Sequence, residues 1–173
     1  NFLAAYVVNF LLKKSPKQFK SSLKKIVGLE HRLELLGNYK NIFFYNDSKA
    51  TNVESSRNAI NSFKSIYWIL GGRKKVGGLN GIDKSLKNVE YAFSFGESGK
   101  EFSEYLSKQG VKSTYYNKLK EVFLIAVEKA LKEKKQINLI FSPACSSFDQ
   151  YKNFEHRGNE FKALVNGTIK SAK

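Results

Sequence analysis

The stretch with the most suggestive chemistry is residues 46–52, Asn-Asp-Ser-Lys-Ala-Thr-Asn. An apolar run at residues 42–45 precedes it and a helical pattern over residues 53–63 follows it, which predicts a strand, a loop and a helix start. In open α/β sheets, ligands bind where strands end and helices begin. Helix-start amides beside Lys49 favour an anionic ligand, and a carboxylate at Asp47 suits a hydroxyl or ammonium group.

Local chemistry alone also allows a structural role for this stretch. Asp47 or Ser48 would then form a turn, and Thr51 or Asn52 would cap the following helix. The choice between the two roles depends on what other loops share the same edge of the sheet.

Two further loops follow apolar runs that predict strands. Residues 71–78, Gly-Gly-Arg-Lys-Lys-Val-Gly-Gly, combine close backbone approach with three cations and favour an anion. A flexible solvated loop has the same composition, and Gly78 stands where a Walker P-loop needs lysine. Residues 142–149, Ser-Pro-Ala-Cys-Ser-Ser-Phe-Asp, place small hydroxyl residues before a helix, which suits a carboxylate or phosphate.

Few residues are available for nucleophilic or metal chemistry. Cys145 is expected to be a buried small residue, because neither His31 nor His156 has the spacing of a catalytic dyad. Cysteine and histidine together total three, so no metal site made by protein ligands alone is expected. Asp149 and Glu155 are expected to satisfy helix-start amides or to pair with Arg157.

Composition bounds the remaining possibilities. The 173 residues are 42% hydrophobic, enough for one domain with a core, and no apolar run is long enough for a membrane span. A single cysteine fits a reducing cytoplasm. The net charge of +15 invites a nucleic-acid role, but only four of the 30 cationic residues are the arginines that base recognition favours. No nucleic-acid partner is therefore expected.

Apolar strands alternate with helices from residue 40 onward. This pattern predicts an α/β fold, a Rossmann-like and mostly parallel sheet flanked by helices. The expected strands cover residues 32–36, 41–45, 66–70, 91–95, 111–116 and 137–141, with the first two forming a hairpin around Gly37 and Asn38. The expected helices cover residues 53–63, 100–109, 118–135 and from about 147 to 165, followed by a frayed polar tail at 166–173.

Two helices are expected before the sheet. Residues 1–12 are apolar enough for a helix buried on most of its surface. A second helix starts with Ser15 as N-cap and Pro16 at its first position, and continues to residues 26–27 before Gly28. Two helices cannot close a core, and the chain has no methionine, so we expect a piece of a longer product or a gene remnant.

Four motifs occur in a fixed order along the chain. They are Leu29-x-His31-Arg32-x-Glu34, then residues 46–52, then Gly71-Gly72-x-x-Lys75, then the block of residues 142–161, which begins Ser-Pro-Ala-Cys and ends Arg-Gly-Asn-x-Phe. With them, essentially the whole chain resembles the C-terminal part of the D-glutamate-adding ligases of the Mur ligase family. The resemblance implies an incomplete central ATP-binding domain at residues 1–28 and a Mur ligase C-terminal domain at residues 29–173.

The resemblance also implies an activity for the full-length protein. In these ligases ATP, with Mg²⁺, phosphorylates the carboxylate of UDP-N-acetylmuramoyl-L-alanine, and the amine of D-glutamate attacks the acyl phosphate to form an amide. Orientation and charge stabilisation would matter more than a protein nucleophile. The main ATP and Mg²⁺ ligands would lie upstream, so the fragment alone is expected to be inactive. A monomer in the bacterial cytoplasm is expected.

Site residues follow from the resemblance by motif position. Asn1, Arg32 and Asp47 would contact the nucleotide, with Asn1 near the adenine. The D-glutamate site would be formed by Thr51, Lys75, Ser147, Phe148 through its backbone, Phe154 and Lys49, with Lys49 and Lys75 as catalytic residues. Residues 28–31 would act as a hinge for domain closure. Departures from the family pattern stand at Glu30, Arg73 and Phe148, and Arg73 puts in doubt an ion pair that would orient Lys75.

Other functions remain open at this point. Another Mur ligase or a folylpolyglutamate synthase would share the fold, but the Asp-Asn-Pro-Arg signature of diaminopimelate-adding relatives does not occur in this sequence. A basic nucleic-acid-binding module and a decayed gene piece are the alternatives outside enzymology.

Overall fold

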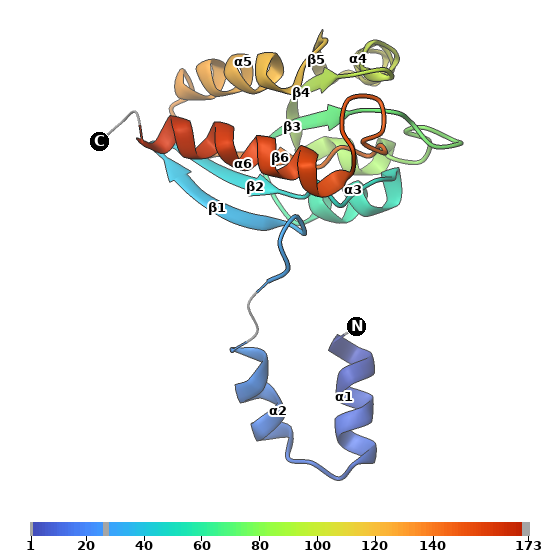
Figure 1. Cartoon of the computed structure of the whole chain (residues 1–173), viewed down its shortest axis with the longest axis vertical. Coiled ribbons are helices and arrows are strands. Elements are labelled where there is room, and N and C mark those ends of the chain that lie inside the picture. The colour runs from blue at the N-terminus through green and yellow to red at the C-terminus, as the bar shows by residue number, and fades with distance from the viewer. Residues whose placement is uncertain (1, 26–27, 171–173) are drawn as a thin grey trace.

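A computed structural model describes residues 2–25 and 28–170 of the chain. Figure 1 shows two parts: a pair of helices, and a layered α/β domain to which a connector joins them. Within the described residues, no helix is both long and apolar enough to cross a membrane.

The α/β domain is built on one six-stranded sheet. The strand order is β1-β2-β6-β3-β4-β5, with β1 antiparallel to β2 and the other neighbours parallel. The strands are β1 (Glu34–Tyr39), β2 (Ile42–Asn46), β3 (Ile66–Gly71), β4 (Val89–Phe95), β5 (Lys112–Tyr116) and β6 (Ile137–Phe141). The predicted Rossmann-like, mostly parallel sheet is therefore confirmed.

Helices cover both faces of this sheet, as Figure 1 shows. One layer holds α5 (Leu119–Leu131) and α6 (Phe154–Lys170), and the other holds α3 (Val53–Asn61), the 3₁₀ helix η1 (Asp83–Asn88) and α4 (Gly99–Lys108). Strand β3 alternates between the two cores: Trp68 and Leu70 face α3 and α4, while Tyr67 and Ile69 face α5. Both faces are buried, which explains the unbroken apolar run.

The predicted hairpin forms, but its turn lies elsewhere. Strand β1 continues through Gly37 and Asn38, and the chain turns at Lys40, whose φ is 50°, and Asn41. Gly37, with a φ of 134°, sits at a register shift in the β1–β2 ladder. Glycine here serves a β-bulge and not a reversal of the chain.

The last helix is displaced from its predicted position. Residues 142–153 stay irregular because their backbone groups bind neighbouring loops, and α6 begins only at Phe154. Its other end reaches Lys170, since Ile169 packs against the α5–α6 core. The predicted fraying is therefore wrong for residues 166–170, and residues 171–173 lie outside the described chain. Helix α5 ends at Leu131, four residues earlier than expected.

The two leading helices are α1 (Phe2–Leu11) and α2 (Pro16–Leu23). Ser15 has the extended backbone of an N-cap and Pro16 is the first residue of α2, as predicted. The other end of α2 lies at Leu23, before residues 26–27, which are not described. Tyr6 of α1 packs on Phe19 of α2, with ring centroids 5.3 Å apart.

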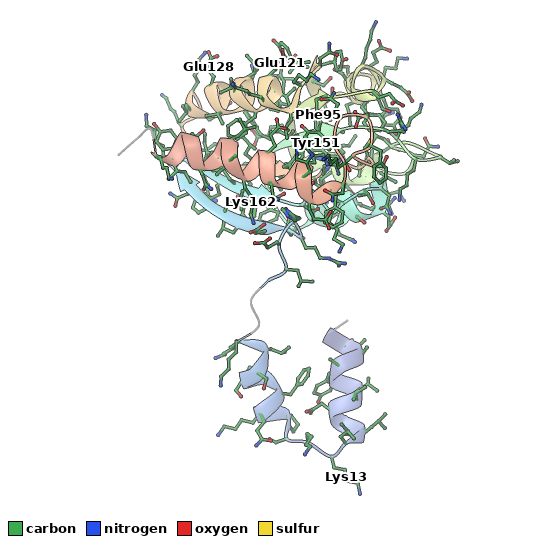
Figure 2. All side chains as sticks on the ribbon, in the orientation of Figure 1. Lys13, Phe95, Glu121, Glu128, Tyr151 and Lys162 are labelled. Carbon is green, nitrogen blue, oxygen red and sulfur yellow. The ribbon has the colours of Figure 1, made fainter. Side chains whose placement is uncertain are left out.

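The expected burial of the first helix is wrong for the described residues. Leu3 is 76% exposed and Leu11 70%, and Figure 2 shows the side chains of both helices projecting around an isolated pair. One helix can cover only one stripe of another, so the rest of α1 stays exposed. The boundary proposed at residue 28 stays a prediction.

Candidate functional site

The three loops singled out in the sequence meet at the carboxyl edge of the sheet. They follow β2, β3 and β6, and β6 lies between the other two strands. The amide of Asp47 donates to the carbonyl of Phe141 at 2.7 Å, and the amide of Gly71 donates to that of Pro143 at 2.9 Å. Arg73 and Ser146 exchange backbone hydrogen bonds of 3.1 and 2.9 Å. The topology thus builds one continuous polar edge.

The buried guanidinium of Arg157 connects the first and the third loop through hydrogen bonds. Its Nη2 donates to the carbonyl of Ser48 at 2.8 Å, its Nε to the Ser48 hydroxyl at 3.2 Å, and its Nη1 to the carbonyl of Cys145 at 3.1 Å. Burial lowers its pKa to about 10, so it stays charged at neutral pH. The expected pairing of Arg157 with Asp149 or Glu155 is wrong, since its donors go to neutral oxygens. Asp149 instead accepts from the Glu97 amide at 3.1 Å.

Asp47 and Arg32 share one cavity, of about 390 Å³, between the first loop and α3. Asp47 is almost fully buried and accepts hydrogen bonds from the Leu33 amide at 3.1 Å and the Ser142 hydroxyl at 2.7 Å. Burial raises its pKa to about 6, while these hydrogen bonds and the charge of Arg32 oppose the rise. The third predicted nucleotide contact, Asn1, lies outside the described residues.

The raised pKa of Asp47 predicts a pH-dependent stability. The folded state holds a proton on Asp47 up to about pH 6, whereas the unfolded chain releases it near 3.8. Stability from this group is therefore lost as the pH rises between those values, by up to about 3 kcal/mol. Asp47→Asn removes the effect, so its stability relative to the wild type should increase from acid to neutral pH in urea unfolding. A constant difference between the two proteins across this range would refute the assignment.

Lys49 and Phe154 come together, as their shared predicted role requires. The Lys49 ammonium lies 4.9 Å from the centre of the Phe154 ring, and the Ser48 hydroxyl donates to the Phe154 carbonyl at 2.8 Å. Lys49 is exposed, so its charge is available to a ligand. Thr51 is half-buried next to it.

Both parts of the structural alternative for this loop are correct. Residues 47–50 form a turn in which the Ala50 amide donates to the Asp47 carbonyl at 2.8 Å. Asn52 caps α3 by accepting from the Ser55 amide at 2.9 Å. Neither structural role uses the Lys49 side chain, whose ammonium lies over the Phe154 ring and has no ion pair within the described chain. The first loop therefore combines a turn and a helix cap with a cation that has no carboxylate partner among the described residues.

The third loop holds Ser147 and Phe148 in opposite environments. Ser147 is buried and its carbonyl accepts from the amides of Gln150 and Tyr151, at 3.2 and 2.9 Å. The Phe148 side chain is 65% exposed, which suits a residue expected to contribute through its backbone.

Lys75 stands apart from the other predicted D-glutamate residues. It borders a different cavity, of about 650 Å³, between the second loop and α4. Its neighbours are paired, Arg73 with Glu97 at 3.0 Å and Lys74 with Glu101, while Lys75 is exposed and has no ion pair within the described chain. The loop is fixed at Gly71 and Arg73, and Lys75 extends beyond those contacts.

Two further features of the described residues bear on nucleophilic and metal chemistry. Cys145 is fully buried, and burial raises its thiol pKa to about 12, so almost no thiolate forms at neutral pH. No group of three or more His, Cys, Asp and Glu side chains among the described residues could hold a metal ion.

A polar network centred on His31 was not predicted as part of the site. The side-chain amide of Asn46 donates to the Nδ1 of His31 at 2.9 Å. The backbone amide of His31 donates to the Glu34 carboxylate at 3.0 Å. The Glu34 carboxylate pairs with Lys162 of α6 at 2.8 Å. The His-x-x-Glu spacing of His31 and Glu34 was the available signal, but nothing in the sequence links it to Asn46 or Lys162.

Comparison with solved structures identifies the fold. The UDP-N-acetylmuramate-alanine ligase of Thermotoga maritima superposes on 96% of the chain with a TM-score of 0.66 at 17% identity, covering 37% of that protein. The MurF ligase of Thermotoga maritima, solved with ADP, superposes on 94% of the chain with a TM-score of 0.53 at 16% identity. The fold is that of the C-terminal domain of the Mur ligases.

Sequence relatives narrow the class further. Two proteins named UDP-N-acetylmuramoylalanine–D-glutamate ligase are similar to the chain. The one from Wolbachia sp. subsp. Brugia malayi is 43% identical over 93% of the chain, and the one from Rickettsia bellii is 36% identical over 96% of it. The chain spans about a third of the length of these relatives, 32% and 37%. No family model matches. The chain belongs to the Mur ligase family, as a segment corresponding to a third of such an enzyme.

Proposed function

We propose that the chain is the amino-acid-binding part of an ATP-dependent ligase that adds D-glutamate to UDP-N-acetylmuramoyl-L-alanine in bacterial cell-wall synthesis. The observation that supports this most is the meeting of three loops at one sheet edge, with Lys49 against Phe154, in a chain whose relatives carry that name. The proposed setting is the bacterial cytoplasm, with a monomeric enzyme and no nucleic-acid partner.

D-Glutamate offers two carboxylates and one amine to this edge. Lys49 would bind one carboxylate while Phe154 packs on the aliphatic chain, and the exposed Lys75 would bind the other carboxylate when its loop closes. Thr51, Ser147 and the Phe148 backbone would supply the remaining hydrogen bonds. The amine would then be held against the activated carbonyl, whose phosphate leaves with its bonding electrons as the amine loses a proton.

ATP would supply the phosphoryl group that activates the acceptor carboxylate. The cavity lined by Arg32 and Asp47 has side chains whose chemistry suits a nucleotide. A guanidinium attracts phosphate, and a carboxylate accepts hydrogen bonds from ribose hydroxyls. Asn1 would lie near the adenine. Mg²⁺ and the UDP sugar would depend on residues beyond those described, and residues 1–28 would belong to the ATP-binding domain that carries them.

A folylpolyglutamate synthase-like function is the second candidate. The bifunctional folylpolyglutamate and dihydrofolate synthase of Yersinia pestis superposes on 88% of the chain with a TM-score of 0.55 at 15% identity. That similarity shows the fold alone, whereas the relatives above 30% identity carry the D-glutamate ligase name.

Titration of the chain with amino acids, followed by backbone amide signals in NMR, tests the proposal. D-Glutamate is expected to move the amides of Thr51, Ser147 and Phe148 more than L-glutamate, lysine or diaminopimelate does. Lys49→Met should weaken D-glutamate binding about tenfold or more, since a charged contact contributes about 1.5–3 kcal/mol. The matched control, Lys120→Met on the remote surface of α5, should bind as the wild type. Equal responses to all four amino acids would exclude the proposed site.

A further inference from the structure

His31 lies where the connector joins the sheet domain, and it touches the proposed D-glutamate site at two points. Its carbonyl accepts from the Lys49 amide at 3.0 Å. Its ring meets the Phe154 ring with centroids 6.1 Å apart and planes at 81°. Phe154 in turn carries the Lys49 ammonium on its ring. One histidine therefore contacts both partners of the cation–π pair.

The side chain of His31 is also held by neighbours other than Phe154. It is 4% exposed, and Asn46 donates to its Nδ1 at 2.9 Å. The Asn46 side-chain oxygen accepts from the Ser48 backbone amide at 3.2 Å, and this contact leaves the Asn46 side-chain nitrogen facing the His31 ring. Gly158 leaves no spare room: a Cβ there would lie 2.2 Å from Nδ1.

The chain around His31, residues 30–34, also contacts the sheet domain through side chains and backbone. Glu30 and Glu34 both pair with Lys162 of α6, at 3.2 and 2.8 Å, and Figure 2 labels Lys162 on the side of α6 where the connector enters. The Leu33 amide binds Asp47. These contacts hold Glu30, Leu33 and Glu34 against the sheet domain.

We propose that His31 is a positioning residue that holds Lys49 and Phe154 in their binding arrangement and couples the connector to the amino-acid site. This inference rests on the proposed function for the identity of the ligand. His31 does not touch the ligand itself. It sets the Lys49 backbone through its carbonyl and the Lys49 ammonium through the Phe154 ring, so a change in the connector reaches the site through two contacts.

Two substitutions displace the ring by different routes. His31→Asn keeps an acceptor near Nδ1 and tolerates the φ of 61° at this position, but it removes the edge against Phe154. Gly158→Ala pushes on the ring from α6. The controls are His156→Asn, at an exposed histidine, and Gly167→Ala on the same helix, where a Cβ would meet nothing within 4 Å.

We expect both test variants to shift the Lys49 amide and the Phe154 ring signals in NMR, with D-glutamate binding weakened about tenfold by the misplaced groups. The Trp68 indole signal reports that the sheet stays folded, because a dispersed signal requires the indole N–H to stay paired with the Ser142 carbonyl at 2.7 Å. Both controls should leave all these signals and the affinity unchanged. Unchanged Lys49 and Phe154 signals in a folded His31→Asn or Gly158→Ala chain would overturn the proposal.

The wild-type chain provides a test that needs no variant. Coupling is reciprocal, so D-glutamate must move the His31 ring signals and leave those of His156 in place. Movement of Lys49 and Phe154 without His31 would also overturn the proposal. If D-glutamate moves none of these signals, the proposed ligand is wrong, and the variant shifts measured without ligand still decide whether His31 positions the pair.

Discussion

Replacing Gly71 with alanine is expected to unfold the sheet domain or to destabilise it by at least about 4 kcal/mol, the range of severe core lesions. Gly71 ends β3 with a φ of 137°, and a Cβ there would lie 1.9 Å from the carbonyl oxygen of Phe95. Neither strand can move aside, because β3 pairs with β4 on one side and β6 on the other. The second loop starts at this residue, so the site would be lost with the fold.

Gly77→Ala is the matched control for Gly71→Ala. Gly77 also has a positive φ, 86°, but nothing lies within 4 Å of its Cβ position. Only the backbone strain of about 1–2 kcal/mol should appear. Urea unfolding followed by the fluorescence of Trp68 measures both. Equal costs for the two substitutions would show that β3 and β4 do not approach each other as described.

Replacing Arg157 with methionine is expected to cost about 3 kcal/mol or more, because it leaves two buried carbonyls, those of Ser48 and Cys145, without their donors. The guanidinium is fully buried and connects loops that are otherwise joined mainly through strand-end hydrogen bonds. Binding of D-glutamate should weaken as well, since Ser48 precedes Lys49 and its hydroxyl also holds the Phe154 carbonyl.

Arg73→Met provides the comparison for Arg157→Met. Arg73 is exposed and pairs with Glu97 at the surface, and such pairs contribute about 0–1 kcal/mol. The difference between the two variants in urea midpoint isolates the buried network. If Arg157→Met cost no more than Arg73→Met, the two loops would not depend on the guanidinium.

The sheet could be predicted from the sequence because its strands have local sequence signals. The unbroken apolar run at 66–70, and the run at 137–141 that only Asn138 interrupts, are buried on both faces, as parallel strands require. The hairpin turn was misplaced because glycine marks both turns and bulges, and only the ladder register separates them. The exposure of α1 could not be predicted, since apolar composition shows that a helix needs a cover and not that a cover is present.

The site was predictable at the level of loops and not at the level of contacts. Strand ends and small polar residues indicated the three loops, and the parallel order of β2, β6 and β3 brought them together. Arg157 binds Ser48 across 109 positions of sequence, and His31 meets Phe154 by a packing contact. Such pairs are set by tertiary geometry, so spacing in the sequence gave no sign of either.

The most direct test of the proposed function is the amino-acid preference of a complete ligase carrying this chain. Joining it to the preceding two thirds of the 43% identical Wolbachia relative gives such an enzyme, and ADP release with UDP-N-acetylmuramoyl-L-alanine can then be compared for D-glutamate, L-glutamate, lysine and diaminopimelate. We predict ADP release with D-glutamate, its loss with Lys49→Met, and none from the 173 residues alone. Faster turnover with any of the other three amino acids would contradict the proposed function.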